Sequence, residues 1–129
     1  MGTGYLVDTN IAIYMLKGIL PENAAVFLSS VLNGGCIMSV ISRIELLGFA
    51  FPDSTDEIKA WKFIEDSAIL SLSDAIADQA IEIRKLHKIK LGDTLIAATA
   101  LVNDLTLLTR NDADFKSIAG LKLVNPFVL

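Results

Sequence analysis

The hydrophobic residues fall into short apolar runs that alternate along the chain with longer stretches of helical spacing. Runs such as Tyr5-Leu6-Val7 and Leu105 to Leu108 are typical of buried strands. Apolar positions three and four apart, such as Phe27, Leu28 and Val31, indicate amphipathic helices. The pattern predicts strands at 5–7, 36–40, 68–72, 105–108 and 121–124, and helices from 9 to about 18, from 21 to a stop at Asn33-Gly34-Gly35, and over 42–49, 54–65, 74–89 and 93–103.

Short strands alternating with helices imply an α/β domain, with a mostly parallel central sheet of about four to five strands flanked by helices. No repeat, low-complexity tract or Pro/Gly-rich linker divides the chain, so residues 1–129 are expected to form one domain. The hydrophobic content of 53% is enough to build a core. In such a sheet the carboxyl ends of the strands share one edge, where ligands usually bind.

Composition excludes several kinds of chemistry. Cys36 is the only cysteine, so neither an internal disulfide nor a thiolate zinc site is expected, and its apolar surroundings indicate a core residue. His87 is the only histidine, which excludes mechanisms that need two imidazoles. Carboxylates and hydroxyls must supply the chemistry. No apolar run approaches the roughly 18 residues of a membrane span, so we expect a cytoplasmic protein with no membrane partner.

The charge distribution leaves room for a nucleic-acid partner despite the net charge of -4. Between Asp53 and Glu82 the chain carries eight acids and two lysines. Four of the 11 basic residues then fall within seven positions that contain no acid: Arg84, Lys85, Lys88 and Lys90. This basic segment is either a patch that attracts phosphate or the solvated face of a helix.

Acidic side chains follow three of the predicted strands. Asp8 ends the first strand, Glu45 lies a few residues after the second, and Asp112 and Asp114 follow the strand at 105–108. The parallel sheet would therefore bring three separated acidic positions toward one edge. Asp93 does not follow a strand, so the pattern alone does not place it with the others.

Each of these acids also has a purely structural explanation. Thr9 and Asn10 can cap the first helix as well as Asp8 can, whereas an ionised carboxylate that ends an apolar strand is costly to desolvate without a cation. Ser42 and Glu45 have the spacing of a capping box, in which the glutamate bonds back to the serine amide. Asp8 therefore favours a functional role, while Glu45 taken alone favours a cap.

The remaining acids are equally ambiguous. Asp93 follows Gly92 and makes a good helix N-cap. Asn111, Asp112 and Asp114 occupy a predicted turn, where such residues are common because they bond to their own backbone. Only the combination of all these acidic positions distinguishes a functional role from a purely structural one.

Taken together, four segments resemble the signature segments of PIN-domain nucleases, and specifically the VapC-type toxins of prokaryotic toxin–antitoxin systems. They run from position 6 to position 115 in the order and spacing of that family. The segments are Leu6-Val7-Asp8-Thr9-Asn10, Ser42-Arg43-Ile44-Glu45-Leu46, Gly92-Asp93-Thr94-Leu95-Ile96-Ala97-Ala98 and Leu108-Thr109-Arg110-Asn111-Asp112-Ala113-Asp114-Phe115.

The resemblance implies a metal-dependent endoribonuclease with a Mg²⁺ or Mn²⁺ site. Members of the family differ over whether the fourth acid lies at the position of Asn111 or of Asp114; we favour Asp114, with Asp112 in reserve. The implied catalytic and metal-binding residues are Asp8, Glu45, Asp93 and Asp114, supported by Thr9, Thr109, Asn111 and Asp112. The implied RNA contacts are Arg43, Arg84, Lys85, Lys88, Lys90 and Arg110.

The implied chemistry is physically consistent. Neighbouring carboxylates repel and raise one another's pKa, and a divalent cation removes that conflict. Oxygen ligands suit Mg²⁺ or Mn²⁺ better than zinc. A water activated by the metal would leave a 5′ phosphate and a 3′ hydroxyl. The resemblance also implies a homodimer and a cognate antitoxin. Phe49, Phe51 and Trp61 are apolar residues that either form a groove for an antitoxin helix or are ordinary core residues.

Other functions of an α/β domain of this length require other residues at these positions. A response-regulator receiver needs an acidic pair after its first strand, and a haloacid-dehalogenase-like phosphatase needs a second aspartate where this chain has Asn10. A PIN fold that has become a silent binding module should have lost its acids, and these are present. A PIN nuclease that processes RNA without an antitoxin is the nearest alternative.

Overall fold

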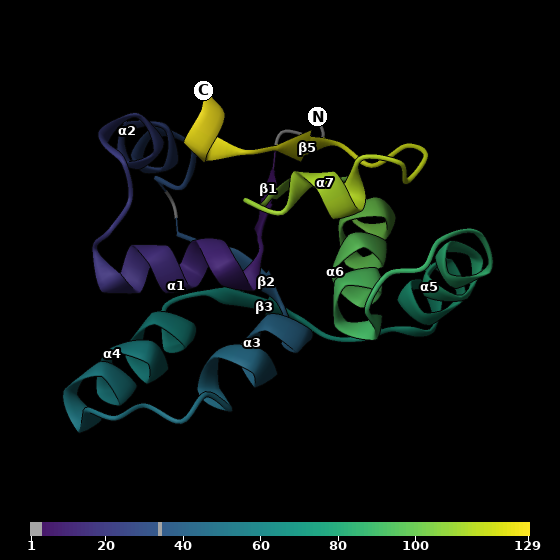
Figure 1. Ribbon diagram of the computed structural model, residues 1–129. Helices are drawn as coiled ribbons and strands as arrows, with labels where there is room; N and C mark the ends of the chain where they lie inside the picture. Colours follow the sequence, from purple (N-terminus) through teal and green to yellow (C-terminus); the bar gives the residue numbers. More distant parts are fainter. Residues whose placement is uncertain (1–3, 34) are drawn as a thin grey trace.

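The computed structural model describes residues 4–33 and 35–129 as one α/β domain (Figure 1). All four strand pairings within the described residues are parallel, and the strand order is β3-β2-β1-β4-β5. The predicted fold class is therefore confirmed. The strands are β1 Tyr5–Val7, β2 Ile37–Ser39, β3 Ala68–Leu70, β4 Thr106–Leu108 and β5 Leu123–Val124.

The predicted helices are present, with shifts at several ends. The helix predicted to end near Ile89 stops at Leu86, and Gly34 of the predicted helix stop lies outside the described residues. Gly18 ends the first helix as expected, with a φ of 65° that favours glycine. The helices are α1 Thr9–Lys17, α2 Glu22–Val31, α3 Val40–Leu47, α4 Ser54–Glu65, α5 Asp74–Leu86, α6 Leu91–Val102, α7 Asp112–Phe115 and the 3₁₀ helix η1 Pro126–Val128.

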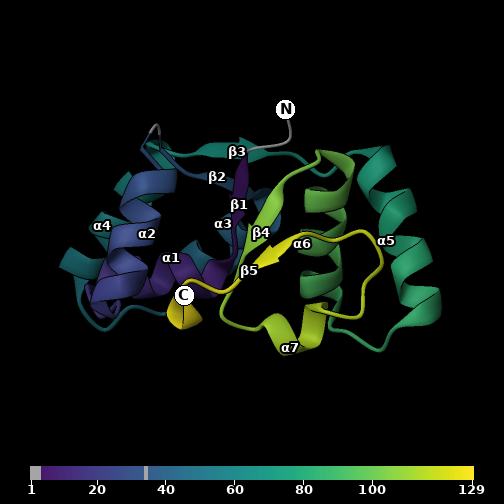
Figure 2. The same ribbon diagram turned by 90° about the horizontal axis from the view of Figure 1, so that it is seen from above.

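Helices cover both faces of the sheet, as Figure 2 shows from above. Leu6 and Leu107 belong to the core cluster that α5 and α6 cover, whereas Val7 and Leu108 belong to the cluster covered by α1 to α4. Successive strand residues thus point to opposite faces, and both directions are buried. This explains why the strands are largely apolar and show no regular alternation of polar and apolar residues.

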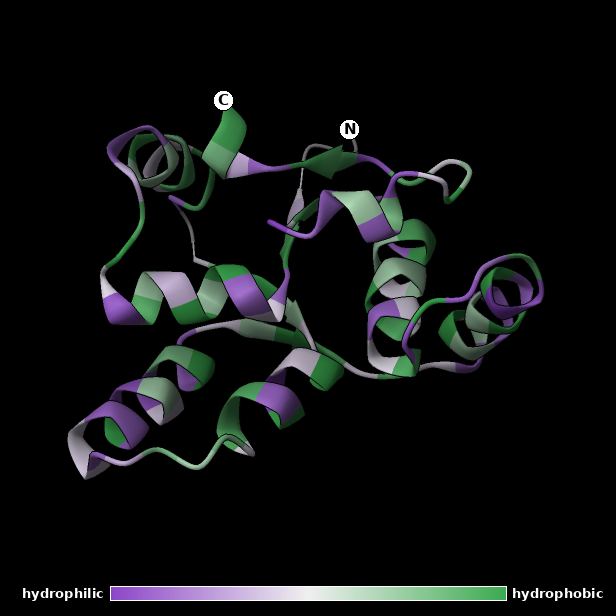
Figure 3. Ribbon diagram, in the orientation of Figure 1, coloured by the Kyte–Doolittle hydropathy of each residue, from purple (hydrophilic) through white to green (hydrophobic). Residues whose placement is uncertain are grey.

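The outer helices carry one polar and one apolar face, and Figure 3 shows the alternation clearly on α4. By contrast α6 is buried from Ile96 to Ala100, as its almost wholly apolar sequence predicts. Cys36 is buried and burial raises the pKa of its thiol, which agrees with a core role. Within the described residues no single helix is long and apolar enough to cross a membrane; α1 and α2 reach that length only together, across a bend of 113°.

The sheet reverses its strand order between β1 and β4. The chain proceeds from β1 to β2 and β3 on one side, then returns to place β4 and β5 on the other. Ligands of open parallel sheets bind at the carboxyl ends of the strands beside such a switch point. Asp8 and Thr109 follow the two central strands there, and the Asp8 amide donates to the Leu108 carbonyl at 3.0 Å.

Candidate active site at the carboxyl edge of the sheet

Asp8 lies at the centre of the site and is only 4% exposed. Its Oδ1 accepts a hydrogen bond from the Thr9 amide at 2.8 Å, so Asp8 itself caps α1. Its Oδ2 accepts from the Thr109 hydroxyl at 2.7 Å, and Thr109 is fully buried. The carboxylate is thus fixed across the switch point by one donor from each side. Of the three caps that the sequence allowed, Asp8, Thr9 and Asn10, the structure uses Asp8.

The pKa of Asp8 is raised to about 6, chiefly because burial disfavours its charged form. The hydrogen bonds from Thr109 and Thr9 lower the pKa, and the nearby charges of Asp93 and Glu45 raise it. Asp8 is therefore a desolvated carboxylate that faces two further negative charges.

Glu45 does not form the capping box suggested by its spacing from Ser42. Helix α3 begins at Val40, and the Ser39 side chain caps it by accepting from the Ile41 amide at 3.0 Å. Glu45 lies well inside the helix and is exposed. Its Oε1 instead accepts from the Thr9 hydroxyl at 2.6 Å. The first turn of α1 thus supplies the hydrogen-bond donor that orients Glu45.

Asp93 is likewise not a helix cap. Helix α6 begins at Leu91 with Lys90 at the N-cap position, which places Asp93 third in the helix and half-buried. Burial raises the pKa of Asp93 most, followed by the charge of Glu45; Lys90 lowers it and Asp114 raises it. Asp93 therefore lies within electrostatic reach of the other acids, a placement that the strand pattern did not predict.

The segment after β4 forms the short helix α7 instead of a simple turn. The Asn111 side-chain amide donates to Asp114 Oδ2 at 2.8 Å, and the Asn111 backbone amide donates to the Thr109 hydroxyl at 3.0 Å. Asp112 Oδ1 accepts from the Asn125 side chain at 3.3 Å. Asp114 raises the pKa of Asp93, so its charge lies within electrostatic reach of that acid, whereas Asp112 does not contribute to it.

Two residues of the site were not singled out from the sequence as site residues. Ser42 is fully buried, and its Oγ lies 2.9 Å from the hydroxyl of Thr9. Its spacing from Glu45 was the available signal, because residues three apart also share a helix face. Gly92 leaves room for Glu45: a Cβ at this position would lie 3.0 Å from Glu45 Oε2.

The donor set fits a hard divalent cation in its chemistry. All candidate ligands are carboxylate oxygens, and three of the four acids are held by a hydroxyl or amide donor. Mutual repulsion that raises the pKa of Asp8 and Asp93 is the conflict that such a cation relieves. Among residues 4–33 and 35–129, however, no three His, Cys, Asp or Glu side chains are close enough together to hold an ion.

The predicted basic segment is not one helix face. Arg84 and Lys85 lie in the last turn of α5, where Arg84 donates to the Ile89 carbonyl at 3.2 Å and Lys85 pairs with Glu82 at 3.2 Å. Lys88 and Lys90 are exposed in the connection that leads to α6, and Lys90 lowers the pKa of Asp93. The explanation as a solvated helix face thus applies only to the first half of the segment.

Comparison with known proteins gives consistent matches over almost the whole chain. The PIN domain profile matches residues 5–121. Ribonuclease VapC10 of Mycobacterium tuberculosis is 32% identical over 122 residues, which cover 91% of this chain and 90% of that protein. A chain of a toxin–antitoxin complex from Klebsiella pneumoniae superposes with a TM-score of 0.78 at 28% identity, covering 98% of this chain and 100% of that one. A chain of VapBC2 from Rickettsia felis, bound to a DNA fragment from its promoter, gives 0.79 at 26% identity, covering 94% and 97%.

Proposed function

This chain belongs to the PIN domain family, and from that membership we propose that it is an endoribonuclease whose active site is the cluster of Asp8, Glu45, Asp93 and Asp114. One observation carries the assignment to these residues. Asp8 is a buried carboxylate at the switch point of the sheet, and its pKa is raised both by burial and by two neighbouring acids. An arrangement that costs folding free energy at neutral pH is typical of a functional site.

We assign a Mg²⁺ or Mn²⁺ ion to this cluster, with the four carboxylates coordinating the metal and its bound water, since no three of them lie close enough together to hold the ion directly. When bound, the cation would lower the pKa of a water molecule and neutralise charge that develops on the phosphate oxygens. Residues of the chain set the ligand geometry: Thr109 holds Asp8, Thr9 holds Glu45 and Asn111 holds Asp114. No covalent protein nucleophile is needed, so the products would carry a 5′ phosphate and a 3′ hydroxyl.

The RNA backbone would follow the basic residues near the cluster. Arg43 is exposed on α3, the helix that carries Glu45, and Lys88 and Lys90 lie in the connection that leads to Asp93. Together with Arg84 and Lys85 they form the proposed phosphate-binding surface.

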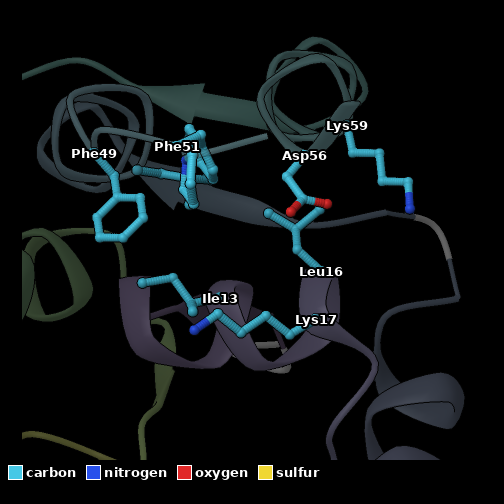
Figure 4. Close-up of a pocket in the computed structure, with 9 residues that line it drawn as sticks. Ile13, Leu16, Lys17, Phe49, Phe51, Asp56 and Lys59 are labelled. Carbon is cyan, nitrogen blue, oxygen red and sulfur yellow. The ribbon is translucent and has the colours of Figure 1, made fainter. Parts of the chain in front are cut away.

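We propose further that the protein is the toxin of a type II toxin–antitoxin pair. Figure 4 shows a hollow of about 380 Å³ in which Ile13 and Leu16 of α1 face Phe49 and Phe51 of the α3–α4 loop. Phe49 is 53% exposed and packs edge-on against Phe51, with ring centroids 5.1 Å apart. A hollow that is apolar at its centre and also lined by Lys17, Asp56 and Lys59 suits an amphipathic helix. Trp61 is 47% exposed but does not line the hollow.

A homodimer in the cytoplasm completes the proposal. Its support is the shallow hollow between α5 and α6, where Ile81 and Leu91 are 53% and 58% exposed. Arg84 and Lys85 line the same hollow, so in a dimer formed there these two residues would serve the interface instead of RNA. Analytical ultracentrifugation tests the dimer. Family membership excludes the phosphotransfer functions, whereas an RNA-processing nuclease without an antitoxin remains the second candidate; a short reading frame directly beside the gene would separate the two.

The nuclease assignment is tested with purified protein and labelled single-stranded RNA in Mg²⁺, in Mn²⁺ and in EDTA. We expect cleavage only with a divalent cation, leaving 3′ hydroxyl ends, and we expect Asp8→Asn and Asp93→Asn to abolish it. Asp78→Asn is the matched control, because Asp78 is exposed on α5, outside the proposed site. Cleavage that survives EDTA, or survives both substitutions, would contradict the proposal.

A further inference from the structure

Arg110, two residues after the end of β4, lies against two aromatic rings that also contact each other. Its guanidinium carbon is 4.4 Å from the ring centroid of Phe127 and 5.2 Å from that of Tyr14. One guanidinium nitrogen donates to the Tyr14 hydroxyl at 2.7 Å, and the two rings contact each other edge-on. A planar guanidinium suits this arrangement because it stacks and donates at once.

The backbone of Arg110 is also held on both sides. Its amide donates to the Asn10 side chain at 3.3 Å, and its carbonyl accepts from the Asn125 side chain at 3.3 Å. Asn10 lies in α1 and Asn125 immediately precedes η1. Segments far apart in the sequence therefore fix this one residue.

The neighbours of Arg110 orient two of the four acids. Thr109 donates its hydroxyl to Asp8, and Asn111 donates its side-chain amide to Asp114. The two are also joined to each other, since the Asn111 amide donates to the Thr109 hydroxyl. A displacement of the Arg110 backbone would move both donors, because Thr109 and Asn111 are its neighbours in the chain.

Phe127 is itself a fixed support. Its amide donates to Asn125 Oδ1 at 2.9 Å, and Asn23 of α2 donates to the carbonyls of Phe127 and Leu129 at 3.5 and 3.1 Å. Pro126 is buried beside it. Figures 1 and 2 show η1 lying next to α2, so the ring that Arg110 contacts belongs to a segment that α2 holds in place.

We propose that Arg110 is a positioning residue and that the stack of Tyr14, Arg110 and Phe127 sets the place of Thr109 and Asn111, and through them of Asp8 and Asp114. The inference rests on the proposed ribonuclease function. It replaces the role expected for Arg110 from the sequence, a contact with the RNA phosphate. Because Arg110 remains exposed overall, that contact is the alternative outcome of the test.

The experiment compares Arg110→Lys and Phe127→Leu, which both keep the net charge. We expect each to lower the cleavage rate at saturating RNA on the order of tenfold, because small displacements of reacting groups have effects of this size. We expect the salt dependence of RNA binding to stay as in the wild type. Lys116→Gln is the control: it removes one exposed charge nearby and touches no part of the stack.

A phosphate contact predicts a different set of results. Phe127→Leu would then cleave at the wild-type rate, Arg110→Lys would stay close to it, and Arg110→Gln would lower the salt slope of RNA binding by about one. That outcome overturns the proposal.

A readout independent of cleavage separates this inference from the function on which it rests. The Asn111 amide, which donates to Thr109, should exchange its hydrogen faster in Phe127→Leu and Arg110→Lys, while the Leu107 amide of β4 stays protected. If Phe127→Leu does not fold, Tyr14→Phe serves instead, because it removes only the hydroxyl that accepts from Arg110. Unchanged exchange at Asn111 refutes the positioning role. Wild-type protein that cleaves no RNA refutes the nuclease assignment and leaves the exchange result valid.

Discussion

Replacing Asp8 by asparagine tests the physical basis of the site, apart from its chemistry. Asparagine has nearly the same shape and keeps an oxygen that can accept from the Thr9 amide, but it carries no charge. The substitution therefore removes the buried ionisable group and leaves the cap of α1 in place.

The expected effect follows from the pKa of Asp8, which rises from 3.8 to about 6 on folding, a difference of about 3 kcal/mol. An acid with a raised pKa binds its proton more tightly in the native protein than in the unfolded chain. The native state is therefore favoured while Asp8 is protonated, and this contribution is lost as the pH rises from about 4 to about 6. Above that range the wild type carries the full cost of the ionised group.

The measurement is the free energy of unfolding by urea, in EDTA, at pH values from 4 to 8. The difference between wild type and Asp8→Asn should fall by about 2 kcal/mol between pH 4 and 6 and level off at about pH 7. Titrating groups that do not interact with Asp8 cancel in this difference, whereas Asp93 and Glu45 are coupled to Asp8 and contribute to the same pH dependence. Asp78→Asn should show no such dependence, because Asp78 is exposed away from the cluster. At pH 7.5 Mn²⁺ should stabilise the wild type, by about 2.7 kcal/mol at a hundredfold excess over its dissociation constant.

A difference in the free energy of unfolding that is the same at every pH does not test the pKa of Asp8, because the new amide must re-pair with Thr109 in any case. The test is how the difference in the free energy of unfolding changes with pH. If the difference is the same at pH 4 and pH 7, Asp8 titrates normally and the reasoning from its burial is wrong. If Mn²⁺ does not stabilise the wild type, the proposed cation site is wrong.

Three other changes have defined outcomes. Gly92→Ala should raise the free energy of unfolding by up to about 1 kcal/mol through helix propensity, yet weaken Mn²⁺ binding in calorimetry, because the new Cβ lies 3.0 Å from Glu45 Oε2; unchanged Mn²⁺ affinity would show that Glu45 moves at no cost. Ser42→Ala should cost about 1 kcal/mol of stability and slow cleavage, since it removes the buried partner of the Thr9 hydroxyl; wild-type cleavage would exclude a role in orienting Glu45. Phe49→Ser should weaken binding of the protein encoded beside the gene about tenfold or more in a fluorescence titration, because Phe49 lines the apolar hollow; equal affinity would place that partner elsewhere.

The fold could be predicted because its strands and its helices leave different patterns of apolar residues in the sequence. Buried strands such as 5–7 and 106–108 are short and largely apolar, and the helices carry apolar positions at helical spacing. Asp8 was also predictable, because it ends the first of these runs. Asp93 was not, since α6 follows a connection rather than a strand and reaches the cluster only through its packing against the sheet.

The start of α3 shows why a local signal in the sequence wrongly suggested a helix cap at Glu45. The spacing of Ser42 and Glu45 is that of a capping box, but the same spacing places two residues on one face of a helix that has already begun. Ser39, at the end of β2, caps α3 instead. The choice between the two arrangements depends on where the strand ends, which is set by its pairing with β1 and β3.

The four acids differ in how far they are part of the fold, and this decides which substitutions report on function alone. Asp8 is buried, caps α1 and accepts from Thr109, so any change there alters folding free energy together with the site. Glu45 and Asp114 are exposed, and each is held by one side-chain donor. Their loss removes a carboxylate while the core stays intact. A drop in activity at these two positions, with stability unchanged, is therefore more direct evidence for the proposed ligand set than the same drop at Asp8.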